Sequence, residues 1–265
     1  MAQVAFVSAG PGAFDLITLR GAQRLASAQV VLFDALTDPA LRSLAPHAEW
    51  IDVGKRGFAH AVKQTEINAL LVRHALAASG LVVRLKGGDA SVFGRLEEEL
   101  QALAAAGIES EVVPGVTAAL AAAAQTQRPL TRRGSGRSVA LSTAMTQTGE
   151  MQASRTADTE VFYMAGQQLP ALGRRLRAAG WPADTPTLVV SRAGCADGLS
   201  SSHALADLAT ASLLHKGRPT VVTVGVGAAA LSAAPSPVAR HPHAEAGQPS
   251  PSLKSGVLPR TSLTP

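Results

Sequence analysis

The stretch Leu81-Val82-Val83-Arg84-Leu85-Lys86-Gly87-Gly88-Asp89 decides the fold. Its first five residues form a mostly apolar run of strand length, and the paired glycines after it indicate a turn. Paired glycines let the backbone approach a ligand with no Cβ in the way, and the carboxylate of Asp89 can accept hydrogen bonds. Taken alone, the Gly-Gly-Asp triplet is equally typical of an ordinary turn with a helix-capping Asp. The rest of the chain must decide between the two interpretations.

Through the first half of the chain, segments of strand length alternate with segments of helical period. The predicted strands cover 4–8, 30–34, 49–53, 81–85 and 111–113, and the predicted helices cover 16–26, 39–44, 65–78, 94–106 and 117–124. In the helix over 65–78 we expect Thr65 to cap the first turn and Leu76 to belong to the apolar stripe. Such alternation is typical of a parallel sheet covered by helices, so it predicts a Rossmann-like α/β domain over 1–115.

After Pro129 the pattern changes. Strands are predicted over 138–142, 160–164, 187–190, 199–203 and 220–224, and a helix is predicted over 169–179. The strands over 187–190 and 199–203 are joined by a short loop that contains glycine, which favours a hairpin. We therefore expect a second α/β domain with a mixed sheet over 116–233. From 234 to 265 the chain is rich in Pro and Ser without an apolar period, which predicts a disordered tail.

The composition excludes several classes of protein. Of the 265 residues, 46% are hydrophobic and 16% are charged, a balance that disordered chains lack. No apolar run is long enough to span a bilayer and the N-terminus does not resemble a secretory signal, so we expect a cytoplasmic protein without a membrane partner. Cys195 is the single cysteine, which excludes an intrachain disulfide and a cysteine-based metal cluster. The seven His residues are scattered, so we predict no bound metal.

The formal net charge of +5 is compatible with nucleic-acid binding. Lys and Arg do not form runs, however, and aromatic residues make up 3% of the chain, which leaves few side chains on which bases could stack. We therefore expect no nucleic-acid partner. Scattered arginines suit a small polyanion better.

Three loops with glycine or small residues follow predicted strands, over 9–12, 87–89 and 114–118. In an open parallel sheet such loops lie along the carboxyl edge, where ligands bind. The first, Ala9-Gly10-Pro11-Gly12, resembles half of a dinucleotide fingerprint, so it is compatible with a plain turn and with a nicotinamide oxidoreductase. No lysine follows a glycine at P-loop spacing, so nothing favours nucleotide hydrolysis.

Several motifs occur in a characteristic order. They are Ala9-Gly10-Pro11-Gly12 with Leu16-Ile17-Thr18-Leu19, Val53-Gly54-Lys55-Arg56, Arg84-Leu85-Lys86-Gly87-Gly88-Asp89, Val92-Phe93-Gly94-Arg95, Val112-Val113-Pro114-Gly115-Val116-Thr117 and Pro129-Leu130-Thr131. Together they make the chain, over about 3–228, similar to the uroporphyrinogen-III C-methyltransferases of the tetrapyrrole methylase superfamily.

The resemblance implies a fold, a reaction and partners. The fold is α/β with two domains, and S-adenosylmethionine is held in the cleft between them. The reaction is transfer of methyl groups to carbon atoms of uroporphyrinogen III, through precorrin-1 to precorrin-2, in sirohaem or cobalamin biosynthesis. The partners are the tetrapyrrole substrate and a second copy of the chain in a homodimer.

The resemblance also implies roles for single residues. Those at cofactor-binding positions are Pro11, Gly87, Gly88, Asp89, Val92, Thr117, Ala118, Met164 and Ala193. Asp34 and Lys55 lie at positions of proton transfer, although an ordinary turn residue and a solvated charge are alternative interpretations. Arg95, Glu98 and Arg133 lie at positions associated with the substrate, whose carboxylates would explain a need for arginine.

The sequence also departs from the pattern of these enzymes. Their Gly before Ala-Gly-Pro-Gly is Ser8 here, their Pro-Phe after Gly-Gly-Asp is Ala90-Ser91, and an Arg that often follows the strand-end Asp is Ala35. Further departures are Ala13, Leu96-Glu97, Ala165, Ala193 and Gly198-Leu199. Two alternatives therefore remain, a methylase of a later precorrin intermediate and a catalytically impaired protein that binds tetrapyrrole or S-adenosylmethionine.

Overall fold

The computed structural model describes residues 3–54, 63–145 and 153–231. It contains two five-stranded sheets, and both belong to one compact unit, Met1–Ala230. The first sheet is parallel and the second is mixed, as the sequence predicts. The proposed domain boundary after residue 115 stays a prediction, and so does the disordered tail, which lies outside the described residues.

The first sheet has the strand order β3-β2-β4-β1-β5, and all of its neighbouring strands are parallel. Its strands are β1 (Val4–Ser8), β2 (Ala28–Phe33), β3 (Glu49–Asp52), β4 (Leu81–Lys86) and β5 (Ser110–Val113). Its helices are α1 (Leu19–Ala26), α2 (Gln64–Ala77) and α3 (Leu96–Ala105), with the 3-10 turns η1 (Phe14–Leu16) and η2 (Pro39–Leu44). Because the strands run the same way, their carboxyl ends meet at one edge.

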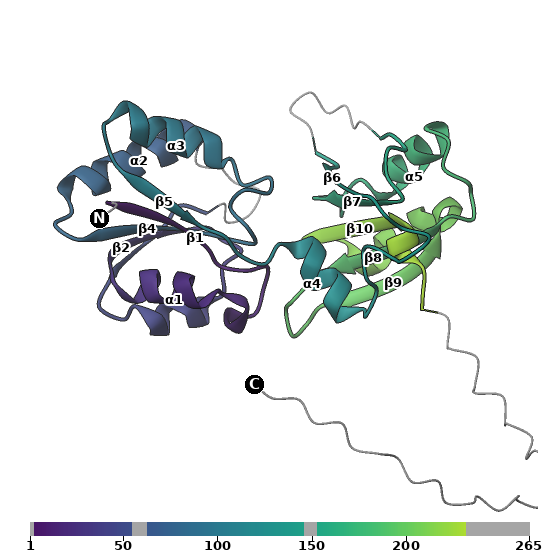
Figure 1. Cartoon of the computed structure of the whole chain (residues 1–265), viewed down its shortest axis with the longest axis horizontal. Helices are drawn as coiled ribbons and strands as arrows, with labels where there is room; N and C mark the ends of the chain where they lie inside the picture. The colour runs from purple at the N-terminus through teal and green to yellow at the C-terminus, as the bar shows by residue number, and fades with distance from the viewer. Residues whose placement is uncertain (1–2, 55–62, 146–152, 232–265) are drawn as a thin grey trace, which may run out of the picture. The chain divides into compact units, whose positions relative to one another are not determined.

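Both faces of the central strands β2, β4 and β1 are covered, which explains why these strands read as mostly apolar runs. Val4 and Phe6 of β1 pack with residues of α2 and α3, whereas Ala5 and Val7 pack with residues of α1 and η2. Figure 1 shows α2 and α3 on one face and α1 on the other. Arg84 lies two positions after Val82 in β4, so the two side chains point to the same face of the sheet, the one that α3 covers.

The second sheet has the order β6-β7-β10-β8-β9, in which only the β6–β7 pair is parallel. Its strands are β6 (Val139–Thr143), β7 (Thr159–Tyr163), β8 (Pro186–Ser191), β9 (Leu199–Ala204) and β10 (Thr220–Gly225). The elements around it are α4 (Ala118–Gln125), α5 (Leu169–Ala178), α6 (Ser212–His215), η3 (Leu205–Ala211) and η4 (Val226–Ala228). The predicted hairpin is confirmed as the antiparallel pair β8–β9.

Two local predictions are wrong. Lys63, not Thr65, is the N-cap residue of α2, because the helix already begins at Gln64. Leu76 is 65% exposed, because the buried face of α2 repeats every four residues through Ile67, Leu71 and Ala75. Leu76 follows that series by one position, about 100° around the helix, and so faces outward.

Candidate functional site

The loops that leave β1, β4 and β5 are joined to one another at the carboxyl edge of the first sheet. Gly10 and Gly88 exchange two backbone hydrogen bonds, of 3.1 and 2.7 Å. The carboxylate of Asp89 accepts from the backbone N–H of Ser91 through Oδ1 and from that of Gly115 through Oδ2, both at 2.8 Å. The sequence left Asp89 open between turn residue and ligand contact, and the structure shows that it holds two loops together.

The loop over 87–91, called the glycine loop below, is open to a ligand. Gly88 has a φ of +70°, and a Cβ built there meets nothing within 4 Å, so glycine is needed for its backbone conformation and leaves bare surface above it. Among the described residues, none accepts a hydrogen bond from the backbone N–H of Gly87 or Asp89. Unpartnered donors beside bare backbone are what a polar ligand group requires.

A cavity of about 440 Å³ lies beside the glycine loop and is called the Asp34 cavity. Its wall includes Asp34 after β2, Gly87, Val92 and Arg95. The structure thus brings together one residue predicted for proton transfer (Asp34), one predicted for the substrate (Arg95) and two predicted for the cofactor (Gly87 and Val92). Lys55, the partner predicted for Asp34, lies outside the described residues.

Below this cavity lies a buried group of charges. Arg84, Lys86 and Glu99 are 2%, 3% and 0% exposed. Lys86 Nζ is 3.1 Å from both carboxylate oxygens of Glu99, and two nitrogens of Arg84 are 3.2 Å from Glu99 Oε1. Burial, followed by the nearby Arg84 cation, lowers the pKa of Lys86. These residues have no role assigned from the sequence, although two cations two positions apart in a buried strand signal a carboxylate partner.

Arg84 fixes the direction of Asp34. One of its terminal nitrogens donates to Asp34 Oδ1 at 2.6 Å, and its other hydrogen bonds go to Glu99 and to the carbonyl oxygens of Leu32 and Leu85. These five bonds match the five N–H donors of a guanidinium. The side chain therefore has no freedom to turn, and Asp34, whose side chain is 30% exposed, is held at the cavity wall.

Arg95, in the wall of the Asp34 cavity, forms a bidentate ion pair with Glu98, with two N···O distances of 2.7 Å. Hydrogen bonding to Arg95 lowers the pKa of Glu98. Both side chains are nearly half exposed, and Arg95 has a left-handed backbone with φ of +55°. Arg133, predicted for the same substrate, is exposed in the connection between α4 and β6 and does not line this cavity.

Other residues predicted to bind the cofactor lie around Tyr163, which is at the end of β7. Its hydroxyl lies 2.8 Å from that of Thr117, the N-cap residue of α4, whose side chain makes no capping hydrogen bond. Val92 and Ala118 pack against the same cluster. Burial raises the pKa of Tyr163, so it stays a neutral phenol. The next residue, Met164, is 43% exposed with φ of +55°. Tyr163 has no role assigned from the sequence, since a Tyr that ends a strand commonly belongs to the core.

Pro11 and the segment after β8 also lie close together. The N–H of Ala13 donates to Gly194 O at 2.8 Å, and a Cβ built on Gly194 would lie 3.2 Å from Pro11 Cγ. Ala193, the neighbour of Gly194, is 5% exposed and packs against α4. A cavity of about 490 Å³ has Pro11 in its wall and shares Ala35 with the Asp34 cavity.

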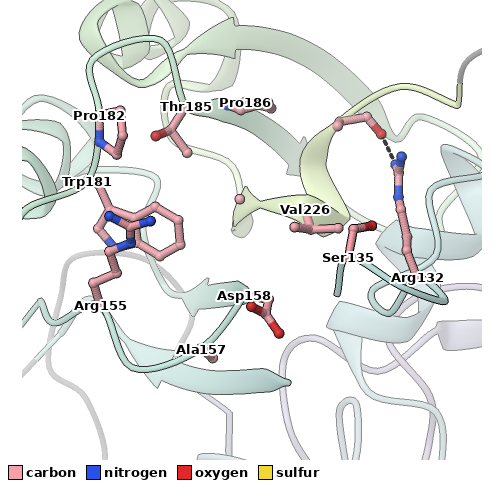
Figure 2. Close-up of a pocket in the computed structure, with 12 residues that line it drawn as sticks. Arg132, Ser135, Arg155, Ala157, Asp158, Trp181, Pro182, Thr185, Pro186 and Val226 are labelled. Carbon is pink, nitrogen blue, oxygen red and sulfur yellow. Dashed lines mark hydrogen bonds between the residues drawn. The ribbon is translucent and has the colours of Figure 1, made fainter. Parts of the chain in front are cut away.

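Another cavity, of about 430 Å³, lies at the second sheet (Figure 2). Arg155 lies over the ring of Trp181, 5.1 Å from its centroid, and donates to Gly180 O. Asp158 accepts from Ser138 and the backbone of Arg137, and Arg132 donates to Ala229 and Ala230. Apart from the buried Nε of Arg132, which has no hydrogen-bond partner among the described residues, the charged side chains of this cavity bond to the protein, so few of their groups are left to bind a ligand.

Within the described residues, no helix is long and apolar enough to cross a membrane. No group of three or more His, Cys, Asp or Glu residues in the same part of the chain could hold a metal ion.

A family model described as Tetrapyrrole (Corrin/Porphyrin) Methylases matches residues 3–209. The chain belongs to this family. It is 42% identical over 195 residues to the uroporphyrinogen-III C-methyltransferase of Pseudomonas aeruginosa. This match covers 72% of this chain and 79% of that protein. It is 45% identical over 213 residues to siroheme synthase 1 of Serratia proteamaculans. That match covers 78% of this chain and 44% of the relative. The chain thus spans less than half the length of the Serratia relative.

A solved structure shows the same fold. The uroporphyrin-III C-methyl transferase of Thermus thermophilus, complexed with S-adenyl homocysteine, has a TM-score of 0.74 and 36% identity to this chain. The match covers 84% of this chain and 97% of that one. The α/β fold with two domains, predicted from the sequence, is thereby confirmed. The homodimer and the cytoplasmic location stay predictions.

Proposed function

We propose that this tetrapyrrole methylase transfers two methyl groups from S-adenosylmethionine to carbon atoms of uroporphyrinogen III, forming precorrin-1 and then precorrin-2. The observation that carries the proposal is the Asp34 cavity, where a fixed carboxylate and an arginine lie beside the open glycine loop. Support also comes from the P. aeruginosa relative, whose name states methyl transfer to a carbon of uroporphyrinogen III. The product would enter sirohaem or cobalamin biosynthesis.

The residues present suit S-adenosylmethionine. The free N–H groups of Gly87 and Asp89 can bind its carboxylate or hydroxyl groups, and the bare backbone of Gly88 allows close approach. Met164 presents a polarisable thioether that packs well against irregular apolar surface. Bound there, S-adenosylmethionine would supply a methyl group already activated on a sulfonium.

The chain's remaining task is to hold the tetrapyrrole in line with that methyl group and to keep water out. Uroporphyrinogen III carries acetate and propionate side chains, and a guanidinium binds a carboxylate through two parallel hydrogen bonds. Arg95 is an exposed cation in the wall of the Asp34 cavity, and Glu98 holds it in one orientation until a substrate carboxylate competes for it. Val92 and Phe93 supply apolar wall to the cavity.

Asp34 is the proton acceptor in this proposal. A pyrrole-type carbon that gains a methyl group leaves a cationic ring, which becomes neutral by losing a proton. Arg84 engages Oδ1 of Asp34, and Oδ2 has no hydrogen-bond partner among the described residues. A carboxylate with one oxygen fixed and the other free is suited to accept that proton.

The test is incubation of the purified chain with uroporphyrinogen III and S-adenosylmethionine without oxygen, followed by mass spectrometry of the tetrapyrrole. We expect products one and then two methyl groups heavier than the substrate. Absence of methylated uroporphyrinogen at every enzyme concentration would contradict the proposal. Turnover of a later precorrin in a parallel reaction would then identify a different substrate, and binding of S-adenosylhomocysteine without turnover would identify an impaired protein.

A further inference from the structure

We propose that Ser8 is a positioning residue, which sets the geometry of the glycine loop through a hydrogen bond to the backbone of Ala90. The proposal rests on the proposed function of this loop in binding S-adenosylmethionine. Ser8 ends β1, and Ala90 lies 82 positions further along the chain, directly after the Gly-Gly-Asp triplet.

The glycine loop ends in a tight turn. The N–H of Val92 donates to Asp89 O at 3.1 Å, so residues 89–92 form a β-turn with Ala90 and Ser91 at its centre. Neither central residue has a positive φ, which excludes the turn types that need one at the second central position. Ala90 occupies the first central position, where proline is favoured because its ring presets φ.

Ala90 has the N–H that a proline would lack, and this N–H is buried. It donates to Ser8 Oγ at 3.0 Å, and Ala90 and Ser8 are 1% and 0% exposed. Without the hydroxyl, the N–H would have no partner in a place that water does not reach. A buried donor left without a partner is unfavourable, so the turn would shift to satisfy it.

Ser8 itself cannot move to follow the loop. It is paired with Lys86 in the β1–β4 ladder, and the next N–H, of Ala9, donates to Lys86 O at 2.8 Å. A Cβ built on Gly115 would lie 2.5 Å from Ser8 Cβ, so the loop that follows β5 packs tightly against Ser8. The hydroxyl is therefore a fixed acceptor.

This fixed bond acts on the groups that face the ligand. Asp89 lies between Gly88, which is bonded to Gly10, and Ala90, which is bonded to Ser8. With both neighbours fixed, the free N–H of Asp89 has one direction. Losing the Ser8 bond releases one of these two neighbours, so the N–H of Asp89 is no longer held in a single direction for a ligand.

The experiment compares Ser8→Ala, Ala90→Pro and the double variant. Affinity for S-adenosylhomocysteine is measured by calorimetry, and KM for S-adenosylmethionine and kcat are measured in the methyl-transfer reaction. For Ser8→Ala we expect about 10-fold weaker binding and about 10-fold higher KM for S-adenosylmethionine, equivalent to about 1.4 kcal/mol, with kcat at saturation within about 2-fold. The double variant should regain wild-type affinity to within about 2-fold, because proline fixes the turn and leaves no N–H to satisfy.

Hydrogen exchange over residues 87–92 gives a readout that needs no ligand. We expect faster exchange in Ser8→Ala and wild-type protection in the double variant at positions that keep an N–H. The control is Ser43→Ala, which removes an exposed hydroxyl that donates to Ala40 O far from the glycine loop in sequence, and it should change neither binding nor exchange.

Wild-type affinity and exchange in Ser8→Ala would overturn the positioning role, and so would a double variant no better than Ser8→Ala. If the wild-type chain transfers no methyl group while Ser8→Ala still loosens residues 87–92 and the double variant restores them, the proposed function fails and the positioning role stands.

Discussion

A guanidinium nitrogen of Arg84 lies 2.6 Å from Oδ1 of Asp34 and fixes this partly exposed carboxylate in the wall of the Asp34 cavity. Arg84 is 2% exposed and Asp34 is partly open, so the pair reaches from the core to the cavity wall. A carboxylate held in this way keeps its direction whether or not a ligand is bound. Preorganisation of that kind is what proton transfer during catalysis requires.

The first prediction concerns Asp34→Asn. The amide keeps the shape of the side chain but cannot take up a proton, so we expect kcat for methyl transfer to fall by about 10²–10⁴-fold. Affinity for S-adenosylhomocysteine should stay within about 2-fold in calorimetry, since the cofactor contacts proposed above do not include Asp34. A variant with wild-type kcat would show that another group accepts the proton.

The second prediction concerns stability and compares Glu99→Gln with Glu97→Gln. Glu99 is fully buried between Arg84 and Lys86, so its neutralisation leaves two buried cations facing an amide. We expect urea denaturation to show a loss of about 3 kcal/mol in the free energy of unfolding. Glu97 is exposed on the same helical turn, and Glu97→Gln should change that free energy by less than about 0.5 kcal/mol. Equal effects of the two substitutions would contradict the role given to the buried charges.

The third prediction is that Arg95→Ala raises KM for uroporphyrinogen III by about 10-fold, as expected for loss of one charged hydrogen-bonded contact. Affinity for S-adenosylhomocysteine should not change. Arg174→Ala is the matched control, because Arg174 is an exposed cation on α5 outside both cavities. Steady-state kinetics with each substrate varied in turn would measure both effects. An unchanged KM in Arg95→Ala would mean that the tetrapyrrole carboxylates bind elsewhere.

Much of the fold could be predicted from the sequence because its signals are local. The central strands of the first sheet are mostly apolar on both faces, and the observed bounds of β1, β4 and β5 differ from the predicted ones by at most one residue. Leu76 was misplaced because α2 contains apolar residues on more than one side, and only contact with the sheet selects the buried face. The position of the three loops at the carboxyl edge of the sheet could be predicted from the parallel topology alone.

The pairings within the site could not be predicted, because they join residues that are distant in the chain. Three acidic residues open α3, and composition does not reveal that Glu99 is the one facing Arg84. The bond between Ser8 and Ala90 spans 82 positions. Each residue alone is unremarkable, and their relationship exists only once β1 and β4 are adjacent.

The last prediction follows from a chain of hydrogen bonds around His215, which is fully buried at the end of α6. Arg218 donates to Ser191 Oγ, and the Ser191 hydroxyl can then donate to His215 Nδ1 at 2.9 Å. His215 Nε2 is 2.9 Å from Ser201 Oγ, which in turn lies 2.7 Å from His203 Nε2. When the rings of His215 and His203 are neutral, the hydroxyls of Ser191 and Ser201 each donate one hydrogen bond.

Burial, and then the neighbouring His203 and Arg218, lowers the pKa of His215. The unfolded chain therefore takes up a proton at His215 near pH 6.5, where the folded chain does not. Stability should be fully present above that pH and should fall as the pH drops below it, until the folded state also becomes protonated. The stabilising form is thus the neutral ring.

We expect the Tm to be lower at about pH 5.5 than at about pH 7.5, with about 2–4 °C lost per kcal/mol in a protein of this size. In His215→Gln this dependence on pH should be weaker, although the variant starts from a lower Tm because its hydrogen bonds are disturbed. His47→Gln is the control, since His47 is exposed and its removal should leave the dependence unchanged. If His215→Gln keeps the full difference in Tm between the two pH values, the pH dependence arises from other groups.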